Sequence, residues 1–66
     1  MDIKNLDIDE LKKLDTKVLT DTELEQLQEH PSVKWFENMG VSGYKIWLTW
    51  WDILLTDGTS MDVYTK

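Results

Sequence analysis

The sequence contains no cysteine, which excludes the disulfides and thiolate metal sites that stabilise many chains of this length. A single histidine, His30, leaves carboxylates as the main available metal ligands, and their spacing matches no calcium-binding loop. We therefore expect no metal and no other cofactor. The 66 residues are enough for one domain, over residues 1–66, whose small core must draw on large aromatic side chains.

Arginine is also missing, and seven lysines stand against thirteen acidic residues, so the formal net charge is −6. Binding of DNA or RNA needs a cationic surface and commonly uses arginine for bidentate contacts, so we expect no direct nucleic-acid binding. An anionic membrane surface would repel the protein in the same way. The expected partner is a protein with a basic surface.

Long apolar segments are absent as well. The longest apolar-rich stretch, residues 46–55, contains Asp52 and is far shorter than the ~20 residues that a membrane helix needs. The first fifteen residues are rich in charges and contain no apolar run of the signal-peptide type. These features predict a soluble protein of the cytoplasm that does not bind membranes.

Two segments of the N-terminal half share a pattern that is typical of a helix start. Asp7 and Thr20 are favoured N-cap residues, and Glu10 and Glu23 follow each of them by three positions, as in a capping box. The acidic residues of each first turn also suit the positive end of the helix dipole. We expect two short helices, over residues 7–15 and 21–30.

A third helix is expected after Pro31, which ends or kinks the second helix because it lacks an N–H group. Val33, Phe36 and Met39 recur at every third position, and Gly40 suits a helix C-cap. The pattern predicts a helix over residues 32–39. Residues 1–40 would then form a helical, acidic part of the domain, and residues 41–66 an aromatic-rich hairpin.

The hairpin prediction rests on composition and on one turn. Residues 44–56 are rich in β-branched and aromatic side chains, which favour strands. Asp57 and Gly58 follow, and a three-residue loop over residues 56–58 needs a glycine in the left-handed region at its last position. We therefore expect strands on both sides of this loop, with Gly58 at a positive φ.

The loop length sets which residues of the hairpin face each other. The expected pairs are Leu55 with Thr59, Ile53 with Met61, and Trp51 with Val63, which make one face of the hairpin apolar. The same register sets Asp52 opposite Asp62, a mildly unfavourable pair of like charges. Residues 44–56 outnumber the seven partner residues, so we expect a bulge near residues 50–51 or a separate strand over residues 44–50.

The sequence also admits a helix in this region. Lys45, Thr49, Asp52 and Thr56 would give a helix a continuous polar stripe, and periodicity alone does not separate the two structures. An all-α fold with residues 44–56 helical is therefore the alternative. The favoured fold class is α+β, with two or three short N-terminal helices packed on a bent C-terminal β-hairpin.

The aromatic residues of the hairpin are the first candidates for binding a partner. Trp47, Trp50 and Trp51 lie within five residues, and on a strand Trp50 points away from the other two. Both faces of the hairpin would carry a large ring, and tryptophan is enriched at binding hot spots. We expect Trp47, Trp50 and Tyr64 to be exposed anchors for a partner, although a small core can also use such rings.

The acidic helix supplies the second candidate surface. Asp21, Glu25 and Glu29 recur at every fourth position and would form an acidic stripe along the expected second helix. Such a row of carboxylates can imitate a phosphate backbone and occupy a basic groove, or it can simply be a solvated face that keeps a small protein in solution. Steering towards a basic partner is a further use of the same charges.

These features predict a small acidic protein–protein interaction module that inhibits or modulates a partner protein. No nucleophile–base arrangement and no glycine-rich phosphate loop indicates an enzyme. In size and charge the chain is similar to small phage or mobile-element proteins that bind and disable a host protein, an analogy of general type only. The alternatives are a nucleic-acid mimic that uses the acidic stripe and a small structural homo-oligomer formed through a strand edge or a tryptophan face.

Overall fold

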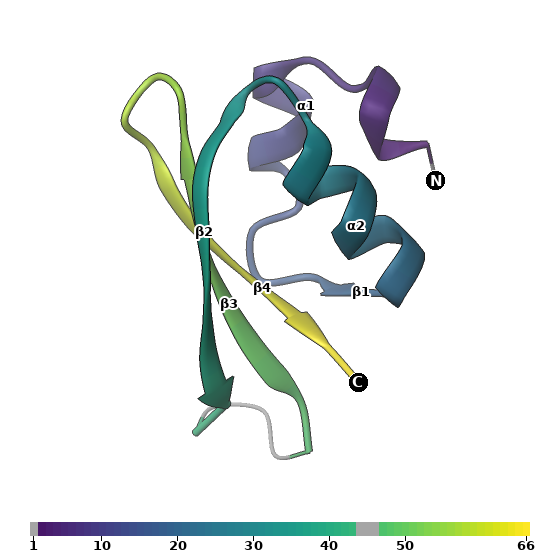
Figure 1. Cartoon of the computed structure of the whole chain (residues 1–66), viewed down its shortest axis with the longest axis vertical. Helices are drawn as coiled ribbons and strands as arrows, with labels where there is room; N and C mark the ends of the chain where they lie inside the picture. Colours follow the sequence, from purple (N-terminus) through teal and green to yellow (C-terminus); the bar gives the residue numbers. More distant parts are fainter. Residues whose placement is uncertain (1, 44–46) are drawn as a thin grey trace.

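A mixed sheet with helices on one of its faces forms the part of the chain that the computed structural model describes, residues 2–43 and 47–66 (Figure 1). The elements in chain order are a short 3-10 helix η1 (Ile3–Asn5), α1 (Ile8–Lys12), β1 (Val18–Leu19), α2 (Asp21–Glu29), β2 (Val33–Val41), β3 (Thr49–Leu55) and β4 (Ser60–Thr65). The fold is therefore α+β. The all-α alternative is wrong, because residues 49–55 form a strand, while residues 44–46 lie outside the described part.

Both expected capping boxes are present. The carboxylate of Asp7 accepts a hydrogen bond from the Glu10 amide at 2.8 Å, and the Glu10 side chain accepts one from the Asp7 amide at 3.1 Å. Thr20 and Glu23 form the same reciprocal pair at 3.1 and 2.9 Å. The second helix has nearly its expected length, but α1 ends at Lys12 because the chain then turns towards Thr16, which has a positive φ of 68°.

The sheet has the strand order β1-β4-β3-β2 in the described residues. The turn at Gly58, which has a φ of 90°, joins β3 to β4 in the expected register, with Ile53 opposite Met61 and Asp52 opposite Asp62. This β3–β4 pairing contains no bulge, so the one expected near residues 50–51 is absent from it. The two-residue strand β1, which the sequence analysis missed, runs parallel to β4.

The expected helix over residues 32–39 is wrong, because this segment forms β2 and pairs antiparallel with β3. Two register irregularities, between Val33 and Trp35 and between Asn38 and Gly40, interrupt its alternation. These irregularities place apolar residues at intervals of three and hide the period of two that marks a strand. Gly40 does adopt a positive φ of 90°, but it lies at the second irregularity and not at a helix end.

The core lies between the helices and one face of the sheet. The helical layer contributes Ile3, Leu11, Leu14, Leu24 and Leu27, and the strands contribute Leu19, Ile53, Leu55, Met61 and Val63. The core residues of β3 and β4 occupy alternate positions: Ile53, Leu55, Met61 and Val63. Their neighbours point to the opposite face, where Tyr64 is also buried. Figure 1 shows α1 and α2 on the same side of the strands, which leaves that opposite face without a helix.

His30 links the end of α2 to Leu6, which lies between η1 and α1. Its ring is buried at the C-cap of α2, where Nδ1 accepts a hydrogen bond from the Ser32 amide at 3.0 Å. The Nε2 atom lies 2.7 Å from the Leu6 carbonyl oxygen, which can only accept. These two contacts together describe a neutral ring with its proton on Nε2. His30 is therefore a structural residue at a helix end, where the sequence placed it.

Candidate functional site

The face of the sheet that points away from the helices is the candidate site, and we call it the open sheet face. Because paired residues of antiparallel strands share a face, the strand register defines its three rows. They are Trp35–Leu54–Ser60, Glu37–Asp52–Asp62 and Gly40–Trp50–Tyr64. A row of three carboxylates thus crosses β2, β3 and β4, with a tryptophan-containing row on each side.

The carboxylate row is short and held firmly at one end. Neighbouring strands lie about 4.8 Å apart, so the three acidic residues span roughly 10 Å. At the β4 end, Asp62 Oδ1 accepts a hydrogen bond from Trp50 Nε1 at 2.8 Å. The main chain of Asp62 is also fixed: its amide donates to Asp15 Oδ1 at 2.9 Å, and its carbonyl accepts from the Thr16 amide at 2.7 Å.

The carboxylates of this row lack a neutralising partner within the described residues. The ion pairs between described residues join Lys12 to Asp9 and to Asp57, and neither aspartate belongs to the row. Asp52 and Asp62 are half-buried and directly opposite each other, while Glu37 is exposed on β2. Like charges that face each other across strands destabilise a sheet, so this face keeps an unfavourable arrangement in the isolated protein.

The structure separates the aromatic residues that the sequence had grouped together. Trp50 is half-buried on the open sheet face, less accessible than expected, and Trp47 is 89% exposed in the turn before β3. Tyr64 is only 7% exposed, so the expectation that its ring is an accessible anchor is wrong. Trp51 lies on the helical side, packs against the core, and donates from Nε1 to Thr65 Oγ1 at 3.2 Å.

The acidic stripe is present as expected but lies elsewhere. Asp21, Glu25 and Glu29 are all exposed along α2, on the side away from the buried leucines of that helix. Since α2 packs on the other face of the sheet, the stripe and the carboxylate row do not form one surface. Within the described residues these are two separate acidic surfaces. Of the two, the open sheet face combines its carboxylates with tryptophan rings, exposed in Trp35 and half-buried in Trp50.

The third aspartate of the hairpin is apart from the row. Asp57 lies in the β3–β4 turn, where its Oδ2 contacts Lys12 Nζ at 2.6 Å and its Oδ1 accepts from the Thr59 amide at 3.0 Å. The hydrogen bond from Lys12 lowers the pKa of Asp57 to about 2. The same contact raises the pKa of Lys12. No group of three or more potential metal ligands is placed to hold an ion anywhere in the described residues.

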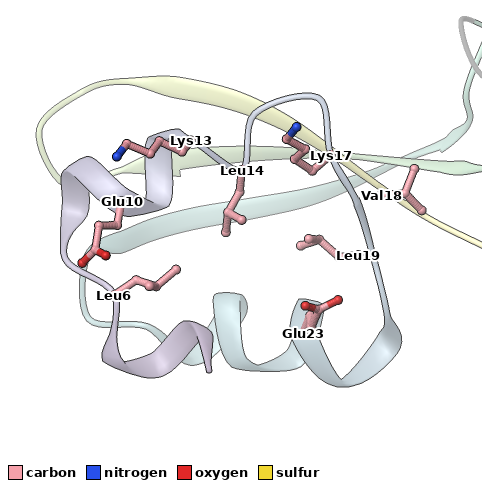
Figure 2. A pocket seen from close by; sticks show the side chains of 8 residues that line it. All are labelled: Leu6, Glu10, Lys13, Leu14, Lys17, Val18, Leu19 and Glu23. Atoms are coloured by element: carbon pink, nitrogen blue, oxygen red, sulfur yellow. The ribbon is translucent and has the colours of Figure 1, made fainter. Parts of the chain in front are cut away.

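A pocket of about 390 Å³ opens between the helical layer and β1 (Figure 2). Its lining consists of Leu6, Glu10, Lys13, Leu14, Lys17, Val18, Leu19 and Glu23. Figure 2 shows the leucines between the charged side chains. Both glutamates accept hydrogen bonds in the capping boxes, and two lysines balance their charge. The pocket is thus an apolar hollow with a neutral rim, and it shares no residue with the open sheet face.

Trp35 and Glu37 are the residues of the open sheet face that sequence reasoning missed. Both residues belonged to the expected helix over residues 32–39, and nothing in a helix would have placed them beside Asp52 and Asp62. The signal that could have found them is the composition of residues 33–41, in which valine, tryptophan and phenylalanine favour a strand. Once β2 is paired with β3, Glu37 lies opposite Asp52 and Trp35 opposite Leu54.

Two further findings bear on the identity of the chain. None of the helices in the described residues is long and apolar enough to cross a membrane. The sequence and the structure were also compared with known proteins, and no family model, no curated protein and no solved structure matches them. A function for the chain must therefore be inferred from the residues of the open sheet face themselves.

Proposed function

We propose that the protein is a small acidic interaction module that binds a basic surface of another protein through its open sheet face. The observation that supports this proposal is the carboxylate row Glu37–Asp52–Asp62, which lies between rows containing Trp35 and Trp50. Lysine or arginine side chains of a partner would neutralise the row. The neighbouring rings offer apolar contact and cation–π interactions to the same side chains.

The energetics of the row favour a basic partner over a neutral one. The cross-strand pair Asp52–Asp62 is unfavourable in the free protein, because both carboxylates are half-buried on one face. A cation placed between them removes this repulsion on binding. Part of the affinity would therefore come from relief of a strain that the free protein already carries. A neutral partner would leave the repulsion in place and would partly desolvate the charges.

The acidic stripe on α2 has a different role in this proposal. Asp21, Glu25 and Glu29 are exposed, and the helix α2 itself contains no aromatic residue. Exposed rim charges act mainly on the rate of association, through long-range attraction that salt screens. The stripe would steer a basic partner, and the open sheet face would hold it. A module of this kind inhibits or modulates its partner by occupying a surface, and we assign it no catalysis.

Two triple variants that remove equal charge test the proposal. The first is Glu37→Gln, Asp52→Asn, Asp62→Asn, and the second is Asp21→Asn, Glu25→Gln, Glu29→Gln. The probe is a peptide selected for binding to the unmodified protein from a random library displayed on phage. We expect the selected peptides to be rich in lysine or arginine, and the first triple variant to weaken their binding about tenfold or more.

The second triple variant serves as the matched control, because it changes the net charge by the same amount. We expect it to slow association while leaving dissociation nearly unchanged. Circular dichroism should show that both variants fold. The first is expected to be at least as stable as the parent, since it removes the Asp52–Asp62 repulsion and an asparagine can still accept from Trp50. The reverse order of effects would instead support the nucleic-acid mimic, with α2 as the binding surface.

A further inference from the structure

The outer edge of β2 is a second exposed surface. Binding of a partner at the open sheet face does not account for the apolar side chains that are exposed there. Large apolar side chains are exposed at six described positions, and four of these lie on β2: Trp35, Phe36, Met39 and Val41. β2 is the last strand of the described sheet on its side, with β3 as its neighbour. Its other edge therefore presents backbone groups that no described strand pairs, beside an unusual amount of apolar surface.

Exposed apolar residues occur on both faces of β2. Trp35 belongs to the open sheet face, whereas Phe36 pairs with Ile53 and Val41 pairs with Thr49 on the helical side. Phe36 is nevertheless 43% exposed and Val41 82% exposed. Figure 1 shows the helices beside the start of β2, and the later part of the strand extends beyond them. A partner lying flat on the open sheet face would leave Phe36 and Val41 uncovered, but a strand added at the edge would contact both faces.

The charges on β2 suit a second copy of the same chain. The strand contains one lysine, Lys34, and one glutamate, Glu37, so its formal charge is zero. The acidic excess of the protein lies mostly in residues 1–30, which have nine acidic residues and four lysines. These residues form β1, at the opposite end of the sheet order, and the helical layer, which lies on one face of the sheet and whose helix α2 contacts β2. Because β2 itself is neutral and the helices lie on a face of the sheet and not along its outer edge, two β2 edges can approach each other with less repulsion than the net charge of −6 suggests.

The alternation of faces restricts how two copies of β2 can pair. In an antiparallel pair related by a two-fold axis, each residue must oppose one from the same face of the sheet. A two-fold axis at Glu37 would set two carboxylates against each other, which is unfavourable. An axis at Phe36 instead sets the two phenylalanine rings together on the helical side. It also sets Trp35 opposite Glu37 of the second copy.

We propose that two copies of the chain associate through their β2 edges, antiparallel and with Phe36 opposite Phe36, to form one continuous sheet. The irregularities on either side of Trp35–Asn38 confine regular pairing to this short stretch. The association is therefore weak and depends on protein concentration. It buries the rings that the helical layer leaves uncovered, and it extends the open sheet faces of both copies on the same side.

Sedimentation velocity over a range of concentrations tests the association. We expect the average mass of the unmodified protein to approach twice that of the monomer as the concentration rises to about 1 mM. Phe36→Lys should weaken the dimer about tenfold or more, because it removes two rings and opposes two charges. Val18→Lys is the matched control, since Val18 is 42% exposed on the strand at the other end of the sheet.

Disulfide formation tests the register, since the chain has no cysteine of its own. Under mild oxidation, Phe36→Cys should form a covalent dimer readily, whereas Val18→Cys and Glu37→Cys should do so far more slowly. A strict monomer at the highest concentration overturns the proposal, as does a dimer that Val18→Lys disrupts and Phe36→Lys leaves intact. Faster cross-linking of Glu37→Cys than of Phe36→Cys overturns the register. Peptide binding by the Phe36→Lys monomer tests the open sheet face independently.

Discussion

Gly58 is the residue whose conformation the sequence predicted most directly. It closes the loop between β3 and β4 with a φ of 90°, a region in which side chains with a Cβ atom are strained. We expect Gly58→Val to reduce the free energy of unfolding by about 1–2 kcal/mol and to lower the melting temperature. No atom lies within 4 Å of the Cβ position at Gly58, so the expected loss comes from the backbone and not from a clash.

Gly43→Ala provides the comparison for this substitution. Gly43 also has open space around its Cβ position, but its φ lies outside the left-handed region. Thermal unfolding followed by circular dichroism should therefore show little change for Gly43→Ala and a clear loss for Gly58→Val. Equal melting temperatures for the two variants would contradict the turn described here.

Asp57 makes the stability of the protein depend on acid. Its pKa is about 2 in the folded protein, below the ordinary value of 3.8, because Lys12 and the Thr59 amide bind its charged form. Because this pKa is lowered on folding, the charged Asp57 carboxylate stabilises the folded protein above about pH 4, and this stabilisation is lost as the pH falls towards 2. We expect Asp57→Asn to be less stable than the parent near neutral pH and to approach its stability in that acidic range.

Urea unfolding at a series of pH values measures this difference. Asparagine keeps the oxygen that accepts from the Thr59 amide, so the comparison isolates the charge contact with Lys12. At alkaline pH the raised pKa of Lys12 gives the opposite dependence, since the contact is lost once the ammonium group loses its proton. A stability difference that stays constant from pH 6 to pH 2 would exclude this role for the ion pair.

At the scale of elements, the two capping boxes were predictable because all their determinants lie within four residues. Thr20 accepts a hydrogen bond from the Glu23 amide at the start of α2, and its loss leaves that donor without its cap. We expect Thr20→Ala to cost about 1 kcal/mol of unfolding free energy. Thr22→Ala is the control, because Thr22 is exposed within the same helix. Denaturant unfolding of both variants, with equal m-values, gives the measurement.

The connection between α2 and β2 depends on His30, whose ring joins segments 24 residues apart in the sequence. We expect His30→Ala to reduce the free energy of unfolding by about 2 kcal/mol, because it removes a buried ring and leaves part-buried polar groups of Leu6 and Ser32 without this partner. His30→Phe keeps a ring of similar size but neither hydrogen bond. If it retained the stability of the parent in denaturant unfolding, packing and not hydrogen bonding would explain the role of His30.

The strand β2 could not be predicted in the same way, since its structure depends on pairing with β3. Its irregularities near Lys34 and Met39 break the alternation of faces, so local spacing pointed to a helix. The β3–β4 register was predictable because a single loop glycine and the apolar pattern agreed. The candidate site was therefore predicted only in part: Trp50 and the Asp52–Asp62 pair follow from the hairpin, but Trp35 and Glu37 need β2.

On the scale of the whole molecule, the short helices cover one face of the sheet and leave the other open. The leucines of the helical layer pack on Ile53, Leu55, Met61 and Val63, and this set forms the core. The sequence indicated that large rings would build much of this core. The buried cluster of the described residues instead consists of aliphatic side chains and Met61, with Trp51 packed against it. Trp35 and Phe36 are exposed at the edge strand, and Tyr64 is buried on the other face of the sheet. Which rings are covered depends on where the helices end, and this is a property of tertiary packing.

None of the four tryptophans is fully buried: Trp35 and Trp47 are exposed, and Trp50 and Trp51 are half-buried. Indole fluorescence shifts to longer wavelength when water can relax around the excited ring. In the folded, free protein, Trp35 and Trp47 should therefore emit near the wavelength of the urea-unfolded state, whereas the half-buried Trp50 and Trp51 should emit at shorter wavelength. Docking of a second molecule over Trp35 or Trp50 should further shift the emission to shorter wavelength. The intrinsic fluorescence of this protein would therefore report contact with a partner as well as folding, with the two exposed tryptophans still able to shift when a partner covers them.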